Sequence, residues 1–214
     1  MRIPKLKDER LAEFTGLMLG DGSIGEYKCK KGDGTSNLQR SVNITISSEE
    51  KEFGDYIQGL VKELFNIKMN RRVKNKENVL ELRTFRKDLF NFVTKDLGLK
   101  KSPKWDRASI PEIYLNNELE NAVLRGYFDT DGSVVLTDNN GTLYPRLEMK
   151  ISPSPMQKQF EQILDRRKFR FGSYDIGKGK KRIQMNGKTQ LKKWQREIGF
   201  SNNKHLEKAE KVLD

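Results

Sequence analysis

Apolar and polar residues follow two different periodicities along this chain. In residues 9–20 and 118–130 the apolar side chains recur three or four positions apart, and this spacing predicts two amphipathic helices. In residues 40–47 and 146–152 apolar and polar side chains alternate strictly, which predicts strands with one buried and one wet face. The chain therefore combines helices with half-buried antiparallel strands, and the predicted fold class is α+β.

The remaining pattern completes the same order of elements in each half: helix, two strands, helix, two strands, helix. The second and third helices of the two halves are expected at residues 49–65, 86–97, 155–168 and 188–198. Further strands are expected at residues 69–75, 78–85, 168–176 and 180–186. We therefore expect two pseudosymmetric αββαββα repeats.

Short landmarks support the duplication, because they occur twice in the same order, about a hundred residues apart. Gly16–Ser23 (GLMLGDGS) recurs as Gly126–Ser133 (GYFDTDGS), and 97–99 (LGL) recurs as 198–200 (IGF). The boundaries that follow are residues 1–99 for the first repeat, 100–117 for a linker and 118–214 for the second repeat.

Composition then narrows the class of protein. The 214 residues carry a formal net charge of +12, which favours a polyanionic partner. One cysteine, Cys29, excludes a disulfide framework, and with one histidine, His205, no Cys/His zinc site can form. No run approaches the roughly 18 apolar residues of a membrane span, and the N-terminus resembles no signal peptide. We expect an intracellular protein, cytoplasmic in a prokaryote or organellar.

Two aspartates occupy unusual positions. Asp21 and Asp131 each end an apolar helix, where the helix dipole disfavours a carboxylate by roughly 0.3–1 kcal/mol. A single Asp-Gly-Ser is most simply a turn, but here it occurs twice in register with the other landmarks. An EF-hand starting at Asp129 is excluded, because its sixth position is Val134 and its twelfth is Asn140.

Small residues four positions apart precede both aspartates: Gly16 and Gly20 in the first helix, Gly126 and Thr130 in the second. Such a stripe lets two helices approach closely. The two carboxylates would then converge, and at about 5 Å they repel by on the order of 3 kcal/mol. A divalent cation removes this repulsion, and oxygen ligands with open water positions suit Mg²⁺.

The segments 14–22 and 124–132 resemble the two signature motifs of the LAGLIDADG homing endonucleases, and the resemblance covers nearly the whole chain. It implies that the motif helices pack at the interface of two halves. It also implies two saddle-shaped antiparallel sheets that face DNA. Asp21 and Asp131 would bind catalytic metal ions, assisted by the backbone carbonyls of Gly20 and Thr130. Mg²⁺ or another divalent cation such as Mn²⁺ would act, whereas Ca²⁺ is expected to be non-catalytic.

Two features depart from the family pattern or leave a choice open. Leu19 stands where the second motif has Asp129, which we expect not to disable cleavage. Family members usually supply a lysine after the third helix of each half. Lys204 is the candidate in the second half, and Lys101 and Lys104 are both candidates in the first.

Polar side chains on the strands and beside the motifs are the expected DNA contacts, because such groups read phosphates and base edges. They are Ser23, Lys28, Lys30, Arg40, Asn43, Thr45, Arg72, Lys74, Glu81, Arg83, Ser133, Arg146, Glu148, Lys150, Arg170, Lys180, Arg182 and Gln184. Matched strands carry different side chains, so the target is expected to be asymmetric.

The resemblance implies metal-dependent cleavage of both strands of duplex DNA at a long target, with staggered ends. Two repeats in one chain predict that a monomer suffices. One alternative is a non-cleaving binder of the same fold, either a DNA-binding regulator or a maturase with intron RNA as its partner. A general basic RNA-binding protein would not need duplicated acids. A nuclease built on Glu148 and Lys150 with Asp131 or Asp138 is a weaker alternative, since one such triplet is expected by chance.

Overall fold

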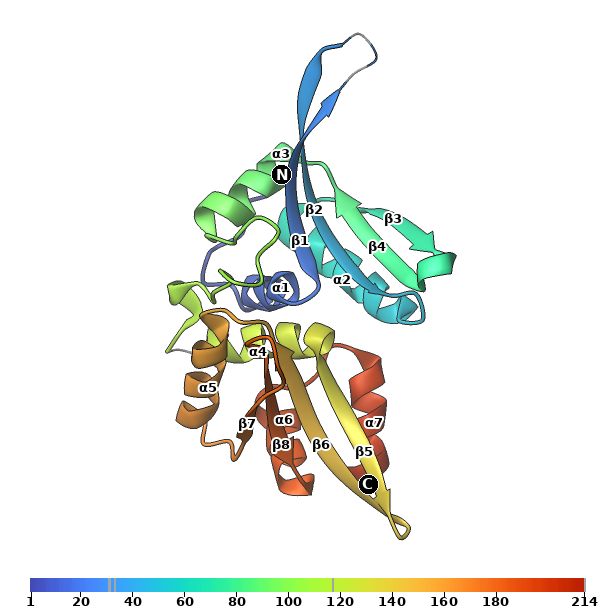
Figure 1. Ribbon diagram of the computed structural model, residues 1–214, viewed down its shortest axis with the longest axis vertical. Coiled ribbons are helices and arrows are strands. Elements are labelled where there is room, and N and C mark those ends of the chain that lie inside the picture. Colours follow the sequence, from blue (N-terminus) through green and yellow to red (C-terminus); the bar gives the residue numbers. More distant parts are fainter. Residues whose placement is uncertain (31, 33, 117, 214) are drawn as a thin grey trace.

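The computed structural model describes residues 1–30, 32, 34–116 and 118–213. Two α+β units lie on either side of a central helix pair (Figure 1). Asn117, at the end of the predicted linker, and Asp214, at the end of the second predicted repeat, lie outside the described residues.

The first unit follows the predicted order of elements. They are α1 (Glu9–Leu19), β1 (Gly22–Lys30), β2 (Ser36–Ser47), α2 (Lys51–Phe65), β3 (Asn70–Lys74), η1 (Asn75–Glu77), β4 (Val79–Thr84), α3 (Lys87–Asn91) and the π-helical η2 (Phe92–Asp96). The strands form one antiparallel sheet in the order β1-β2-β4-β3.

The second unit repeats the order of the main helices and strands, with η3 before its motif helix and α7 after its third helix. Its elements are η3 (Glu112–Tyr114), α4 (Leu119–Asp131), β5 (Gly132–Asn139), β6 (Thr142–Ile151), α5 (Met156–Arg166), β7 (Gly172–Asp175), β8 (Lys181–Asn186), α6 (Lys188–Glu197) and α7 (Asn203–Leu213). The sheet order is β5-β6-β8-β7, which is the order of the first sheet. The predicted α+β fold with two repeats is therefore confirmed.

Three local predictions were wrong. The helix α7 was not predicted, because the helix expected over 188–198 was taken as the last element of the second repeat, although His205, Ala209 and Val212 form a buried stripe. The strand expected over 168–176 is only β7, since Lys168 takes a positive φ of 55° and ends the preceding helix. The first motif helix ends at Leu19, so Asp21 lies beyond the helix, not at its last position.

Each sheet packs its apolar face on helices of its own unit. In β2 the side chains of Val42 and Ile44 are buried completely, and in β6 Leu147 and Met149 are buried to the same degree. This is the alternation that the sequence predicted, with every second residue turned to the core. The other face of each sheet carries polar side chains.

The two units meet through α1 and α4, which lie against each other at the centre of the molecule (Figure 1). A Cβ added to Gly16 would lie 2.2 Å from the carbonyl oxygen of Val123, and one added to Gly126 would lie 2.1 Å from that of Glu13. Both positions therefore require glycine, and the predicted small-residue stripe is the contact surface.

The segment predicted as a linker is packed against both units. The backbone N–H of Ser102 donates to the carbonyl of Ile24 at 2.9 Å, and Ala108, Ile110 and Tyr114 are buried. In the second unit, Gln159 of α5 bonds both backbone polar groups of Ile110. The segment thus holds its residues at fixed places near the helix pair.

Gly126→Ala should lower the free energy of unfolding by more than about 2 kcal/mol, because the methyl group overlaps the backbone of α1. Gly59→Ala is the matched control, since Gly59 is also helical but nothing lies within 4 Å of its added Cβ. This control should gain about 0.5–1 kcal/mol from better helix propensity. Urea unfolding of both variants measures the difference, and equal effects would contradict the close helix contact.

Candidate active site

Asp21 and Asp131 come together at the end of the helix pair. A Cβ on Gly20 would lie 2.0 Å from Oγ1 of Thr130 and 3.2 Å from Oδ2 of Asp131. The first motif therefore ends directly against the second, and a glycine is needed there to leave room for the Thr130 side chain. The predicted convergence of the two motifs is present in the structure.

The two carboxylates stand in an unfavourable electrostatic environment. Burial, then the charge of Asp131 and then that of Glu50, raise the pKa of Asp21 from 3.8 to about 7. Loss of hydration to the surrounding protein atoms also raises the pKa of Asp131, although the residue as a whole is exposed. Both aspartates hold their negative charges at a cost, and a cation placed between them would lower that cost.

Lys104 is the lysine that the structure places in the first half of this site. Its Nζ donates to the carbonyls of Met18, Gly20 and Gly22, the last two at 2.8 and 2.7 Å. Burial lowers its pKa to about 8, opposed by the charges of Asp131 and Asp21. The ammonium thus neutralises the C-terminal carbonyls of α1 and lies within electrostatic reach of both aspartates.

The other two candidate lysines differ in their relation to this site. Lys101 pairs with Glu26 on β1 and lies 5.7 Å from the ring centroid of Phe90, so the choice between Lys101 and Lys104 favours Lys104. Lys204, near the start of α7, has its Nζ 3.5 Å from Oε1 of Glu50. Its charge acts on Asp21 and lowers that pKa.

A divalent cation fits the residues present. Asp21 and Asp131 supply hard carboxylate oxygens, and Gly20 leaves the space beside Asp131 that a Cβ would fill. Within the described residues, no group of three or more His, Cys, Asp or Glu could hold an ion, so water and substrate oxygens would complete the coordination. The carbonyl of Gly20, expected as a ligand, accepts from Lys104. The backbone carbonyl of Thr130 as a ligand stays a prediction, and the hydroxyl of this residue donates to the carbonyls of Gly126 and Tyr127.

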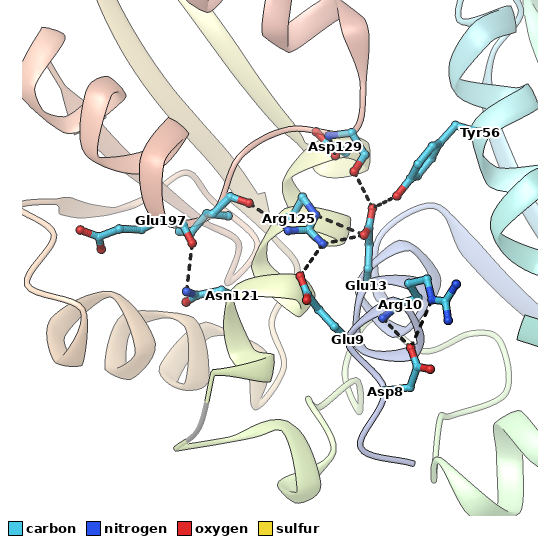
Figure 2. A network of polar contacts seen from close by, with 11 residues as sticks. Asp8, Glu9, Arg10, Glu13, Tyr56, Asn121, Arg125, Asp129 and Glu197 are labelled. Atoms are coloured by element: carbon cyan, nitrogen blue, oxygen red, sulfur yellow. Dashed lines mark hydrogen bonds and ion pairs between the residues drawn. The ribbon is translucent and has the colours of Figure 1, made fainter. Parts of the chain in front are cut away.

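A polar network across the contact of α1 and α4 joins the two units (Figure 2). Glu13 of α1 is buried and pairs with Arg125 of α4 at 2.8 Å, and Arg125 also reaches Glu9. Tyr56 of α2 and Ser201 both donate to the carboxylate of Glu13 at 2.6 Å. Sequence reasoning missed this network, because nothing in the pattern marks Glu13 as facing the other unit.

The structure accounts for the difference between the two motifs. Asp129 is buried and accepts from the backbone N–H of Ser201 at 2.7 Å, so it supports the fold from within the second unit. Burial raises its pKa to about 8, well above that of an ordinary aspartate. Leu19 occupies the matching position of the first motif as a buried apolar residue, and neither side chain belongs to the carboxylate pair.

The polar face of the first sheet begins directly after Asp21. In register order, Ser23 stands opposite Asn43, which stands opposite Arg83, and Thr45 stands opposite Glu81. Arg72 and Lys74 of β3 lie on the same face. Asn43 and Glu81 are themselves buried, because both bond to Arg83: its Nε donates to Asn43 and its Nη2 pairs with Glu81.

The polar face of the second sheet begins after Asp131 in the same way. Ser133 stands opposite Glu148, Glu148 opposite Gln184, and Lys150 opposite Arg182. Arg146 shares this face and donates to Glu148 at 2.6 Å. Arg170 and Lys180 flank β7 and β8 without belonging to either strand.

Three of the expected DNA contacts lie on the wrong face of the first sheet. Side chains alternate between the two faces along β1 and β2, and the register puts Lys28, Lys30 and Arg40 on the face of Ile24 and Val42. That face is opposite to the one that carries Asn43. Arg40 pairs with Glu26 at 2.8 Å and lies over the ring of Phe90. The expected list included both parities of the β1–β2 pair, and the register of the two strands separates them.

Three exposed tyrosines on the polar faces were missed. Tyr27 lies on β1, Tyr144 on β6 and Tyr174 on β7, with exposed fractions of 41%, 57% and 48%. Large exposed side chains on a polar sheet face are a recognisable signal for a contact surface. Their parity, read together with the register, could have identified them.

No helix in the described part of the chain is long and apolar enough to cross a membrane.

Sequence comparisons agree with this architecture. Residues 118–199 match the family described as the LAGLIDADG-like domain. Over 130 residues the chain is 29% identical to a DNA polymerase of Methanocaldococcus jannaschii. The aligned region covers 58% of this chain and 7% of that protein. Over 128 residues it is 27% identical to the replication factor C small subunit of the same organism, which is 59% of this chain. The chain spans 6% of the latter protein, so it corresponds to a small part of either relative.

Solved structures extend the similarity to nearly the whole chain. Mesophilic variants of the homing endonuclease I-DmoI superpose with a TM-score of 0.59 and 22% identity, over 89% of this chain and 95% of that one. The I-SmaMI LAGLIDADG homing endonuclease bound to cleaved DNA superposes with a TM-score of 0.63 and 11% identity, over 97% and 88% of the two chains. The resemblance to the two-motif LAGLIDADG proteins is confirmed, and the chain has their two-repeat fold.

Asp21→Asn should stabilise the protein at neutral pH. Because the folded state raises the pKa of Asp21 to about 7, it binds a proton more tightly than the unfolded state does, and stability falls as pH rises from about 4 to 7. The amide removes this loss, so the free energy of unfolding should rise by about 1–3 kcal/mol at pH 7.5 and little at pH 4. Chemical unfolding in chelator measures it, with exposed Asp165→Asn as the control. A destabilised Asp21→Asn at pH 7.5 would contradict the repulsion.

Proposed function

We propose that this protein is a site-specific endonuclease that cleaves both strands of duplex DNA with the help of divalent cations. The observation that carries the proposal is the pair Asp21 and Asp131, brought together where α1 and α4 end, with Lys104 beside them. A structural role does not explain two carboxylates whose pKa values are both raised by their surroundings.

Duplex DNA is the proposed substrate because of charge and shape. A net charge of +12 attracts a polyanion, and each half presents a sheet whose polar face starts two residues after an aspartate. Sheets can lie in the major groove and read base edges. The side chains at matched rungs differ between the halves, so the proposed target is long and asymmetric, and one chain suffices to cover it.

Different side chains would bind the cations and stabilise charge at each scissile phosphate. Asp21 and Asp131 would hold the cations, Mg²⁺ or Mn²⁺. When bound, such ions supply activation of a water molecule and stabilisation of the leaving 3′-oxygen. Lys104 stabilises negative charge that develops on the phosphate, and its carbonyl contacts keep the ammonium in place. The helix contact at Gly16 and Gly126 sets the spacing of the carboxylates.

The comparisons support this proposal in its general form. Structures of I-DmoI with DNA and Mn, and with DNA and Ca, have the same fold as this chain, with TM-scores of 0.59 and 0.56. We propose Mg²⁺ as the working ion here, staggered ends as the product, and an intracellular location, cytoplasmic in a prokaryote or organellar, where genomic DNA is present.

The experiment that tests the proposal is digestion of a randomised duplex library with and without Mg²⁺, followed by sequencing of the ends. Cuts that need the metal and cluster at one long motif with a fixed stagger would support it. Specific retention of duplex without cuts would favour a non-cleaving binder, and preference for structured RNA would favour a maturase.

Asp21→Asn and Asp131→Asn should each abolish cleavage of the selected target and leave duplex binding intact, because only the carboxylate pair would hold the cations. Plasmid cleavage and gel-shift affinity measure the two properties on the same preparations. Asp165→Asn, an exposed change on α5, is the control and should cut normally. Cleavage that survives in either active-site variant would falsify the assignment of the centre.

Lys150→Ala should weaken binding without changing the metal requirement. Lys150 is exposed on the polar face of β6, and loss of one phosphate contact should reduce the salt slope of binding by about 0.9. Lys62→Ala removes an exposed lysine from α2 and should leave the slope unchanged. Binding measured at several salt concentrations decides this, and equal slopes for the two variants would exclude the second sheet from the interface.

A further inference from the structure

The lysine of the second unit is restrained by an acid of the first. Lys204 lies at the beginning of α7, and its Nζ is 3.5 Å from Oε1 of Glu50, which immediately precedes α2. The Lys204 side chain is 50% exposed, whereas that of Glu50 is 16% exposed. The lysine is therefore the more exposed partner of the pair and the carboxylate the more buried one.

Further hydrogen bonds fix Glu50 in place. The side-chain amide of Asn202 donates to Oε1 of Glu50 at 2.8 Å and to the backbone carbonyl of Asp129 at 3.1 Å. Asn202 is buried, and its side-chain oxygen Oδ1 accepts from the backbone N–H of Lys204 at 3.1 Å. Glu50 is thus connected to the end of α4 and to the start of α7 at the same time.

The second unit has no acid at the matching position. The residue that immediately precedes α5, as Glu50 precedes α2, is Pro155, which has no charge. The charges of Glu50 and Lys204 both act on Asp21. The acid and the lysine therefore belong to the surroundings of Asp21.

We propose that Glu50 is a positioning residue that holds Lys204 back from the DNA phosphate on the Asp21 side, so that the two strands are cut at unequal rates. This inference rests on the proposed endonuclease function. A carboxylate and a phosphate compete for the same ammonium group, and Glu50 is already within reach of it. Lys204 then stabilises the phosphate of the strand cut on the Asp21 side less than it would without Glu50.

The expected effect is modest, because an exposed ion pair of this kind is weak. Glu50→Gln keeps the size of the side chain and removes the competing charge. At saturating Mg²⁺ it should speed cutting of one strand by roughly two- to fivefold and leave the other strand nearly unchanged. That strand should be the one whose cutting Lys204→Met slows more.

Glu52→Gln is the matched control. Glu52 lies in the first turn of the same helix and accepts from Asn203 at 2.7 Å, much as Glu50 accepts from Asn202, but the acid that pairs with Lys204 is Glu50. It removes the same charge from the same region. Its strand ratio should equal that of the unchanged protein.

The strand-specific test uses a target duplex labelled on each strand in turn. The double variant Glu50→Gln/Lys204→Met should cut like Lys204→Met alone, because the acid acts through the lysine. A Glu50→Gln effect that persists without Lys204, or that Glu52→Gln reproduces, would overturn the inference. A purely structural role would change both strands alike.

A binding test without metal separates this inference from the proposed function. On any duplex, Glu50→Gln should steepen the salt slope by about 0.9, the value for one added phosphate contact, and the Lys204→Met background should remove this gain. A chain that cuts neither strand but shows this gain would fail as an endonuclease and still have Glu50 restraining Lys204. No gain in slope relative to Glu52→Gln would overturn the restraint, whether or not the protein cuts.

Discussion

The contact between α1 and α4 is the constraint on which the rest of the structure depends. At Gly16 and Gly126 each helix backbone lies where the other residue's side chain would be, so the two units cannot separate or slide without losing a close-packed surface. Because β1 and β5 start directly after the two motifs, this single contact also sets the positions of both sheets. The distance between the carboxylates follows from it.

The contact brings negative groups together, and nearby cations neutralise only some of them. Asp21 and Asp131 are brought together at helix ends that already carry negative charge. Lys104 neutralises the carbonyls of α1, and the pair Glu13 and Arg125 stabilises the interface behind the site. The carboxylates themselves remain undercompensated, with pKa values above the ordinary range. Stability is thus lower than it could be at the place where the proposed chemistry needs charge.

The two halves share a fold but not a chemistry. Asp129 is a buried support in the second motif where the first has Leu19, and Glu50 restrains a lysine where the second unit has Pro155. Duplication fixed the backbone path of each unit, because the sheet order and the helix contact must match for the halves to fit. Side chains away from that contact were free to diverge, which suits an asymmetric partner.

Periodicity and duplicated landmarks are local properties of the chain, so they were enough to predict the two repeats, the parity of the central strands and the candidates Asp21 and Asp131. The choice of Lys104 over Lys101 depends on the path of the loop after the first unit. The placement of Lys28 and Lys30 opposite the polar face depends on the register of β1 with β2. The tertiary structure also created the contact of Glu50 with Lys204. These two residues lie on different units, and no local pattern reports that they meet.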